Sequence, residues 1–320
     1  MIVAVSAMIA ERYGERLRGI SPEIELVWPT GDGGWTGDVQ SAEAVYFSED
    51  YWTSGASRAM LPQLFTLPKL RWFHTFSAGV DHPAFRLLLE RGVTLTNSSG
   101  TTSEPIAQYV LAMMLRIVKR LDVWAEAQRE RRWESIESDE LTGKTVGIVG
   151  VGHIGGEVAR LARAFNMHVI GCRRRQRRTR YVDEIVPPER LHELLARSDF
   201  VVLAAPLTVE TEGLIGEAEL RAMRADAWLI NISRGRVVQE QALVDALETG
   251  RIGGACLDVF EEEPPPEASP LWSLPNVIVT PHNAGRSPQN MARGSEVFID
   301  NLGRFVTGKA LRNRVRLSDL

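Results

Sequence analysis

The chain has 320 residues, of which 44% are hydrophobic and 24% are charged. This composition is ordinary for a soluble globular protein, and the length leaves room for two domains with separate cores. The formal net charge of −4 and the pI near 6.0 exclude the strongly basic balance of a typical nucleic-acid-binding domain.

Neither the N-terminus nor the cysteines indicate secretion. Residues 1–17 have an apolar start without a basic segment, which predicts a first strand and helix and not a signal peptide. No uninterrupted apolar run approaches the ~18 residues that a membrane-spanning helix needs. The two cysteines, Cys172 and Cys256, lie in separate apolar segments, as reduced thiols do in cytoplasmic proteins. We therefore expect a soluble, cytoplasmic protein.

Short apolar runs alternate with helix-period segments in the first third of the chain. A helical stretch over 82–92 ends at Gly92, a residue type common at helix C-termini. The alternation predicts a doubly wound α/β fold with a parallel sheet. The predicted strands are residues 2–7, 24–29, 44–48, 70–77 and 93–99.

The helical pattern over 103–133 is much longer than the usual ~11–12 residues of a globular helix. A helix of that length could bridge two domains or pack in a dimer interface. The last helical segment, 290–315, is expected to return to the first domain. Between them lies a second series of strands, predicted at 144–150, 168–172, 200–206, 227–233, 253–259 and 276–281.

A glycine-rich turn joins the strand at 144–150 to an amphipathic helix. Gly150, Gly152 and Gly155 fit the pattern G-x-G-x-x-G, with His153 and Ile154 between them at the start of the helix. The first glycine allows the tight turn, the second lets a pyrophosphate approach the backbone, and the third permits close helix–strand packing. Because a helix N-terminus offers unpaired N–H groups and a favourable dipole to an anion, this turn predicts a dinucleotide site.

The next strand is followed by six arginines between positions 173 and 180. An NAD site usually has Asp or Glu here, about 20 residues beyond the glycines, to bind the ribose 2′-hydroxyl. Arg173 and Arg174 stand there instead, and guanidinium groups bind a 2′-phosphate through charge-assisted hydrogen bonds. We therefore predict NADP(H) as the preferred cofactor and NAD(H) as the alternative. A solvated loop is expected for the other arginines, Arg175, Arg177, Arg178 and Arg180.

Three strands of the last third end on side chains suited to carbonyl reduction. Arg234, Asp258 and His282 each stand at the carboxyl end of a predicted strand. Ligands of open α/β sheets bind at this edge. An arginine, a carboxylate and a histidine that converge there form a consistent set for reducing a carbonyl group.

Taken in order, these motifs resemble the D-isomer specific 2-hydroxyacid dehydrogenase family, in particular its glyoxylate/hydroxypyruvate reductase branch. The resemblance covers essentially the whole chain. In the first third it lies in "FSAGVDH" and "TNSSGTTSEPIAQYVLAMML". Farther along it lies in "GIVGVGHIGGEVA", "LAAPLTVETEGLIG", "LINISRGRVVQEQALVDAL", "GGACLDVFEEEPPP" and "NVIVTPHNAG".

The resemblance implies a split architecture with two doubly wound parallel-sheet domains. A flavodoxin-like substrate domain would combine residues 1–100 and 287–320. A Rossmann-type dinucleotide-binding domain would occupy residues 101–286. The resemblance also implies a homodimer built around the cofactor domains, with the active site between the two domains of each chain.

By the same resemblance, Arg234, Glu263 and His282 form the catalytic set. Arg234 would hold the substrate carboxylate and polarise the carbonyl. His282, a residue type that titrates near neutral pH, would donate or accept the proton. Glu263 would hydrogen-bond the far imidazole nitrogen and orient the ring. Glu261 and Glu262 compete for that role from the same loop, and Glu263 is chosen because it directly precedes a proline, as in the family pattern.

The remaining site residues also follow from the resemblance. The backbone N–H groups of Ala78, Gly79 and Val80 would receive the substrate carboxylate. Asp258 would bind the nicotinamide carboxamide, and the other cofactor contacts would come from Thr101, Pro206, Leu207 and Ser233. The other histidines are expected to be mainly structural, with His82 as the exception because it lies beside the substrate loop.

The sequence thus predicts an NADPH-preferring oxidoreductase that reduces a 2-keto acid, such as glyoxylate or hydroxypyruvate, to the D-2-hydroxy acid. Trp72, Phe73 and Phe76 near the substrate loop leave aromatic or branched keto acids open. The alternatives are a phosphoglycerate or formate dehydrogenase relative, and a corepressor-like protein that senses a dinucleotide. No metal-ligand cluster, nucleic-acid partner or membrane partner is predicted.

Overall fold

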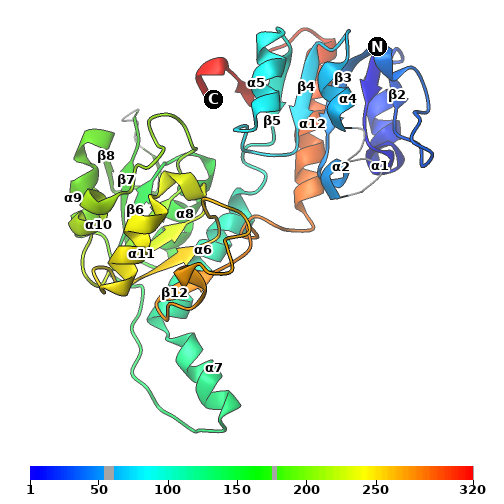
Figure 1. Cartoon of the computed structure of the whole chain (residues 1–320). Helices are drawn as coiled ribbons and strands as arrows, with labels where there is room; N and C mark the ends of the chain where they lie inside the picture. The colour runs from blue at the N-terminus through cyan, green and yellow to red at the C-terminus, as the bar shows by residue number, and fades with distance from the viewer. Residues whose placement is uncertain (54–60, 175–178, 320) are drawn as a thin grey trace. The chain divides into compact units, whose positions relative to one another are not determined.

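The chain folds as two units (Figure 1). A computed structural model describes residues 1–53, 61–174 and 179–319. Unit 1 consists of Met1–Thr101 and Ser287–Leu320, and unit 2 is the continuous stretch Thr102–Arg286. Thr101, which the sequence places with the dinucleotide-binding segment, therefore lies in unit 1.

In its described residues, unit 1 contains a six-stranded sheet in the order β13-β5-β4-β3-β1-β2. Neighbouring strands are parallel except for the β13–β5 pair. Without β13 this is the flavodoxin-like order 2-1-3-4-5. The strands are β1 (Ile2–Ala4), β2 (Glu25–Val27), β3 (Ala42–Phe47), β4 (Trp72–Thr75), β5 (Thr94–Asn97) and β13 (Arg314–Val315).

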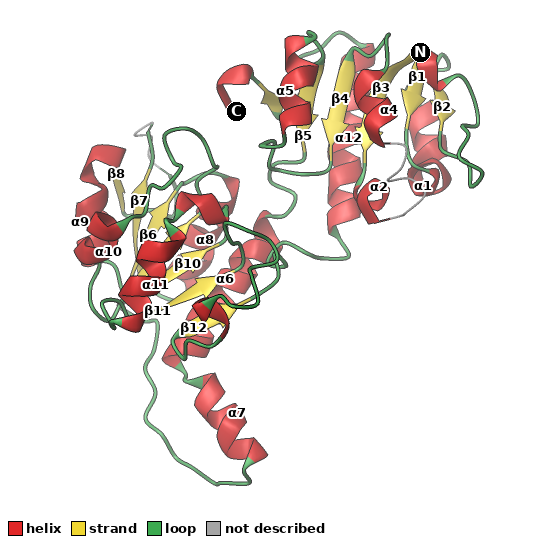
Figure 2. Cartoon of the chain, in the orientation of Figure 1, coloured by secondary structure: helices red, strands yellow, loops and turns green. Residues whose placement is uncertain are grey.

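Helices cover both faces of the unit 1 sheet (Figure 2). Tyr46 and Trp72 face α1 and α12, where the ring of Phe298 stacks on both, with centroids 4.4 and 5.1 Å away. Their strand neighbours Phe47 and Phe73 face α4 and α5 instead, because successive side chains of a strand point to opposite faces. The helices are α1 (Ala7–Arg18), α2 (Glu49–Thr53), α4 (Leu61–Thr66), α5 (Pro83–Glu90) and α12 (Asn290–Val306).

Unit 2 contains a seven-stranded parallel sheet in its described residues, in the order β12-β11-β10-β9-β6-β7-β8. The first strand of the unit in chain order, β6, lies in the interior of the sheet; the chain then continues outward through β7 to the edge strand β8 and crosses back to β9. This is the Rossmann order with one added strand, and its topological switch point lies between β6 and β9. The strands are β6 (Thr145–Val149), β7 (His168–Cys172), β8 (Glu184–Val186), β9 (Phe200–Leu203), β10 (Trp228–Asn231), β11 (Gly254–Leu257) and β12 (Val277–Val279).

The unit 2 sheet is also covered on both faces. Val110 and Met114 of α6 pack with Val158 of α8 on one face. Leu194 of α9 and Leu243 of α11 belong to the core on the other face. The helices are α6 (Ser103–Val118), α7 (Leu121–Arg129), α8 (His153–Ala164), α9 (Leu191–Arg197), α10 (Glu217–Ala222) and α11 (Glu240–Glu248). The predicted fold class, two doubly wound parallel α/β units, is confirmed. No helix among the described residues is both long and apolar enough to cross a lipid bilayer.

The single long helix predicted over 103–133 is wrong. α6 ends at Val118 and α7 begins at Leu121, because Arg120 takes a left-handed conformation with φ 51° and ψ 42°. A left-handed residue cannot continue a right-handed helix. We call residues 121–140 the arm, because α7 and the irregular segment after it stand off from the rest of unit 2 (Figure 1).

Candidate active site

The glycine turn after β6 is built by close packing at two of its three glycines. Gly150 has φ +98°, and a Cβ on it would overlap the backbone of Ala205 after β9. A Cβ on Gly155 would overlap the carbonyl oxygen of Gly150. Gly152 has no neighbouring atom within 4 Å of a Cβ position, and it caps α8 without a side-chain hydrogen bond. The turn therefore leaves an open surface at the first turn of α8, where a pyrophosphate fits.

The arginines after β7 lie at the carboxyl edge of the same sheet. Arg173 is half-buried and its N–H donates to the carbonyl of Val186 at 3.1 Å, whereas Arg174 is exposed. The hydroxyl of Thr208 and, less strongly, the charge of Arg174 lower the pKa of Glu210. Arg180 is exposed above the ring of Tyr181. Arg175, Arg177 and Arg178 lie outside the described residues.

The turn after β9 carries the residues predicted for the adenosine side. Pro206 is exposed, and its carbonyl accepts a hydrogen bond of 2.6 Å from the hydroxyl of Thr211. Leu207 is half-buried against the core of unit 2. His153 and Ile154 stand in the first turn of α8, on the other side of the switch point. His153 and Ile154 after β6, and Pro206 and Leu207 after β9, thus flank the point where the strand order reverses.

His282 is hydrogen-bonded to one of the three competing glutamates, Glu263. The imidazole Nδ1 lies 2.8 Å from Glu263 Oε2, and Glu263 Oε1 accepts the N–H of Phe260 at 3.1 Å. A carboxylate only accepts, so Nδ1 carries the proton toward Glu263. Glu261 instead exchanges hydrogen bonds with Glu240 at the start of α11. The side chain of His282 is half exposed, which leaves its ring accessible to a substrate.

Asp258 holds the loop that carries His282. Its side chain is buried, and its Oδ1 accepts the hydroxyl of Thr280 at 2.6 Å and the N–H of Asn283 at 2.8 Å. Its Oδ2 accepts the N–H of Ala284 at 2.9 Å, and its backbone carbonyl accepts the N–H of His282 at 2.8 Å. His282 itself has φ +51°, a left-handed conformation that persists only where the surroundings enforce it. The hydrogen bonds of Asp258 to this loop hold His282 in that conformation.

Arg234 stands on a loop that packs against the loop of Glu263. Asn231, the last residue of β10, donates through Nδ2 to the carbonyl of Arg234 at 3.1 Å and accepts both the N–H and the hydroxyl of Ser233. The half-buried guanidinium donates to the carbonyl of Ser233 at 2.8 Å. A Cβ on Gly235 would overlap the peptide between Phe260 and the next residue. Gly235 therefore lets the arginine loop and the glutamate loop meet backbone to backbone.

The predicted substrate loop and Thr101 belong to unit 1. The carbonyl of Ala78 accepts a hydrogen bond of 2.8 Å from the side chain of Asn97, and all three residues of the loop, Ala78, Gly79 and Val80, are half-buried. The hydroxyl of Thr101 donates to the carbonyl of Ser98 at 2.8 Å. The carboxyl ends of β4 and β5 thus support this loop within unit 1.

The other histidines have structural contacts. His74 is fully buried between Thr96 and Ser98, and burial lowers its pKa to about 3. His82, the expected exception, caps α5 by accepting the N–H of Ala84 at 3.2 Å. His168 lies 3.3 Å from Asp183, and His192 lies 2.9 Å from Glu219.

Comparison with known proteins decides the family. The profile of the D-isomer specific 2-hydroxyacid dehydrogenase NAD binding domain matches residues 111–284. A glyoxylate reductase from Korarchaeum cryptofilum is 38% identical over 257 residues, which are 78% of this chain and 76% of that protein. This chain belongs to the D-isomer specific 2-hydroxyacid dehydrogenase family. The resemblance drawn from its motifs is confirmed.

Two further members of the family show how far the likeness extends. A glyoxylate/hydroxypyruvate reductase B from Pectobacterium carotovorum is 38% identical over 261 residues, covering 78% of this chain and 79% of that protein. A solved structure of a D-isomer specific 2-hydroxyacid dehydrogenase from Xanthobacter autotrophicus, in complex with NADPH and MES, is 31% identical and covers 98% of this chain and 97% of its own, with a TM-score of 0.78. The chain is therefore an NAD(P)-dependent 2-hydroxyacid dehydrogenase.

Some residues that shape this dehydrogenase site could not be predicted from sequence patterns. Tyr109 and Thr280 contact each other although they lie far apart in the chain, and no spacing rule links them. Asn231 and Gly235 lie within the segment "NISRGR". A polar residue and a glycine directly after a strand are the only features of this segment that could have pointed to their roles. Among the described residues, no group of three or more His, Cys, Asp or Glu side chains is arranged to hold a metal ion.

Proposed function

We propose that this dehydrogenase reduces small 2-keto acids, glyoxylate and hydroxypyruvate first, and prefers NADPH to NADH. The observation that carries the proposal is the 2.8 Å contact between His282 and Glu263 at the carboxyl edge of a dinucleotide-binding sheet. The relatives named glyoxylate reductase and glyoxylate/hydroxypyruvate reductase support the substrate class. The related structure solved with NADPH supports the cofactor.

The chain offers a matching surface for each part of the cofactor. The open turn at Gly152 and the first N–H groups of α8, including those of His153 and Ile154, receive the pyrophosphate. Arg173, with Arg174, binds the 2′-phosphate through guanidinium hydrogen bonds. The remaining contacts are assigned to Thr101, Pro206, Leu207, Ser233 and Asp258.

Each catalytic side chain then has one task in the reduction. The bound nicotinamide supplies a hydride to the keto carbon, so negative charge develops on the carbonyl oxygen. Arg234 polarises that carbonyl and binds the substrate carboxylate, together with the N–H groups of the Ala78–Val80 loop. His282 donates a proton from Nε2 to the carbonyl oxygen, because its Nδ1 is held by Glu263. In the oxidation direction, His282 accepts the proton from the hydroxyl group.

The aromatic residues near the predicted substrate loop belong to the core of unit 1. Trp72 and Phe73 are fully buried in opposite halves of that core, so neither is available to line a substrate pocket. Phe76 is half-buried and packs against the same core as Phe73. The burial of Trp72 and Phe73 therefore removes one reason to expect an aromatic keto acid, and the relatives named after glyoxylate and hydroxypyruvate support the short acids.

Initial rates with NADPH and NADH on glyoxylate, hydroxypyruvate and phenylpyruvate test the proposal. We expect the highest kcat/KM with NADPH and a two- or three-carbon acid. Replacing Arg173 with aspartate is expected to raise KM for NADPH by about 100-fold, because one charge-assisted contact is lost and a repulsive charge is gained. Arg180→Asp, which changes an arginine of the same run, is the matched control and should change KM less than about threefold. Equal use of both cofactors by the unaltered enzyme would show that Arg173 does not bind a phosphate.

We further propose that the protein is a cytoplasmic homodimer that binds no nucleic acid. Burial raises the pKa of Cys172 to about 11 and that of Cys256 to about 12, which keeps both thiols protonated and suits a reducing compartment. The net charge of −4 supports a small-molecule partner in place of nucleic acid.

The arm supports the dimer. α7 has nine residues and buries only Ala127, whereas Leu121 and Trp124 are exposed and Trp133 is fully exposed. Isolated helices below ~12–15 residues are marginal in water, so α7 needs apolar packing that its own unit does not supply. Exposed indoles of this kind mark protein interfaces. A second copy of the chain is the occupant we propose.

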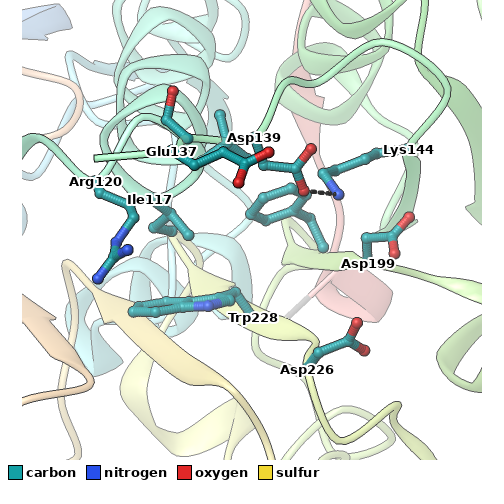
Figure 3. A pocket seen from close by; sticks show the side chains of 11 residues that line it. Ile117, Arg120, Glu137, Asp139, Lys144, Asp199, Asp226 and Trp228 are labelled. Atoms are coloured by element: carbon teal, nitrogen blue, oxygen red, sulfur yellow. Dashed lines mark ion pairs between the residues drawn. The ribbon is translucent and has the colours of Figure 1, made fainter. Parts of the chain in front are cut away.

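A recess at the base of the arm is where the second arm would pack (Figure 3). It has a volume of about 630 Å³ and lies between the end of α6, the returning segment of the arm and the amino ends of the sheet strands. Its carboxylates outnumber its cations, although Lys144 and Asp139 form an ion pair at 2.5 Å. The indole of Trp228 forms one side of the recess (Figure 3). Trp133 and the neighbouring Arg131 of a second copy would supply an apolar ring and a positive charge there.

Substituting Trp124 and Trp133 with serine is expected to weaken dimerisation by at least about 30-fold, since buried indoles are dominant contacts at interfaces. Sedimentation equilibrium or light scattering across a concentration series measures this shift. Trp272→Ser, which changes an exposed tryptophan outside the arm, is the matched control. A double variant that stays dimeric at the same concentrations as the unaltered protein would exclude the arm as the interface.

A further inference from the structure

Tyr109 begins a chain of hydrogen bonds that ends at the histidine loop. Its hydroxyl lies 2.8 Å from the hydroxyl of Thr280, which lies 2.6 Å from Oδ1 of Asp258. A carboxylate only accepts hydrogen bonds, so the hydroxyl of Thr280 donates its hydrogen to Asp258. The oxygen of Thr280 then accepts from Tyr109. The direction of the chain is therefore fixed: Tyr109 to Thr280 to Asp258.

Asp258 passes this restraint on to His282. The same Oδ1 that accepts from Thr280 also accepts the N–H of Asn283, and Oδ2 accepts the N–H of Ala284. Rotation of the carboxylate would disturb all three bonds. His282 lies inside this loop in its left-handed conformation, so the orientation of its ring depends on how firmly Asp258 is held.

The origin of the chain is rigid. Tyr109 stands on α6, whose Val110 and Met114 are fully buried in the core of unit 2. Burial raises the pKa of the Tyr109 hydroxyl to about 12, so it remains a donor throughout the working range of a dehydrogenase. α6 also packs near the far end of the loop, because Ile106 and Ala284 belong to the same core cluster. One helix thus supports the histidine loop at both ends.

We propose that Tyr109 is a positioning residue for proton transfer, acting through Thr280 and Asp258 to aim His282 at the substrate carbonyl. The inference rests on the proposed role of His282 as the proton donor. Tyr109 touches neither substrate nor cofactor in this scheme. Its contribution is to hold the general acid in one geometry, and small misplacements of a catalytic group are costly to rate.

Tyr109→Phe removes the hydroxyl and keeps the ring. We expect kcat for glyoxylate reduction to fall about tenfold, with the Kd for NADPH changed less than twofold and the thermal midpoint nearly unchanged. The solvent deuterium isotope effect on kcat should rise, because proton transfer becomes slower than the other steps. Thr280→Val should lower kcat about 100-fold, since it breaks both links of the chain, and Thr280→Ser should restore most of the rate because it retains the hydroxyl.

Two comparison variants separate the possible outcomes. Tyr46→Phe changes a buried tyrosine in unit 1 and should leave kcat and the isotope effect unchanged. His282→Gln tests the proposed function itself. If His282→Gln abolishes turnover while Tyr109→Phe keeps the full kcat, the positioning role alone is wrong. If His282→Gln keeps its activity, the proton-donor role and the inference built on it both fail. A Tyr109→Phe enzyme that loses NADPH affinity and thermal stability together with kcat would show a merely structural role.

Discussion

Substituting His282 with glutamine is expected to lower kcat for 2-keto acid reduction about 1,000-fold, while the Kd for NADPH stays within twofold. Glutamine fills a similar volume and can still hydrogen-bond to Glu263, but it cannot donate a proton to the developing alkoxide. General acid catalysis contributes typically 10²–10⁴-fold. Glu263→Gln should cost less, about 10–100-fold, because the ring keeps a partner at Nδ1 but loses the carboxylate that stabilises its protonated form. Stopped-flow absorbance of NADPH gives the rate, and fluorescence titration gives the affinity.

The matched control is the second histidine–glutamate pair of unit 2. His192 and Glu219 lie 2.9 Å apart, with His192 on the exposed side of α9. His192→Gln should therefore leave both kcat and NADPH binding unchanged. A His282→Gln enzyme that retains more than a tenth of the original kcat would show that another group delivers the proton.

Substituting Gly235 with alanine is expected to lower kcat more than 100-fold and the free energy of unfolding by about 3 kcal/mol. The added Cβ would overlap backbone atoms of Phe260, which no side-chain rotation can relieve. The loop of Arg234 and the loop of Glu263 must then separate. Because the N–H of Phe260 donates to Glu263, this separation also disturbs the carboxylate that holds His282.

Gly303→Ala provides the contrast for Gly235→Ala. Gly303 lies within α12, and the nearest atom to its Cβ position belongs to Ile20 at 4.0 Å. Alanine in an open helical position should raise the free energy of unfolding by about 0.5–1 kcal/mol and leave kcat unchanged. Urea unfolding and steady-state rates measure both quantities. If Gly235→Ala retains the original stability, the close approach of the two loops is not required by the fold.

The features predictable from sequence are those set by local patterns. The spacing of the glycines predicts a tight turn at Gly150 and close helix–strand packing at Gly155. Gly150 has φ +98°, and a Cβ on Gly155 would overlap the carbonyl oxygen of Gly150. The strands β8 and β13 are not among the predicted ones, and β13 has only two residues, too few to show a period. The break at Arg120 was missed as well, since neither glycine nor proline marks it.

Contacts between distant loops were beyond the sequence patterns. Asp258 was assigned to the nicotinamide by resemblance, but its bonds to Thr280, Asn283 and Ala284 span more than twenty residues. The packing of Gly235 on Phe260 likewise depends on how two strand ends meet in the sheet. Such contacts follow from strand order, which spacing along the chain does not encode. The catalytic assignments of Arg234 and Glu263 remain predictions, and Glu263→Gln tests the second of them.

The division of unit 1 into two stretches of chain has a consequence for synthesis on the ribosome. Tyr46 and Trp72 emerge within the first stretch, but Phe298, which stacks on both rings, belongs to α12 in the second. At 5–20 residues per second, roughly 10–40 s pass between translation of residue 101 and residue 290. Unit 2 is continuous, and all of its residues are translated within that interval. During that time the rings of Tyr46 and Trp72 lack the ring of Phe298 that stacks on them in the folded protein. Exposed apolar side chains of this kind on a nascent chain are binding sites for chaperones.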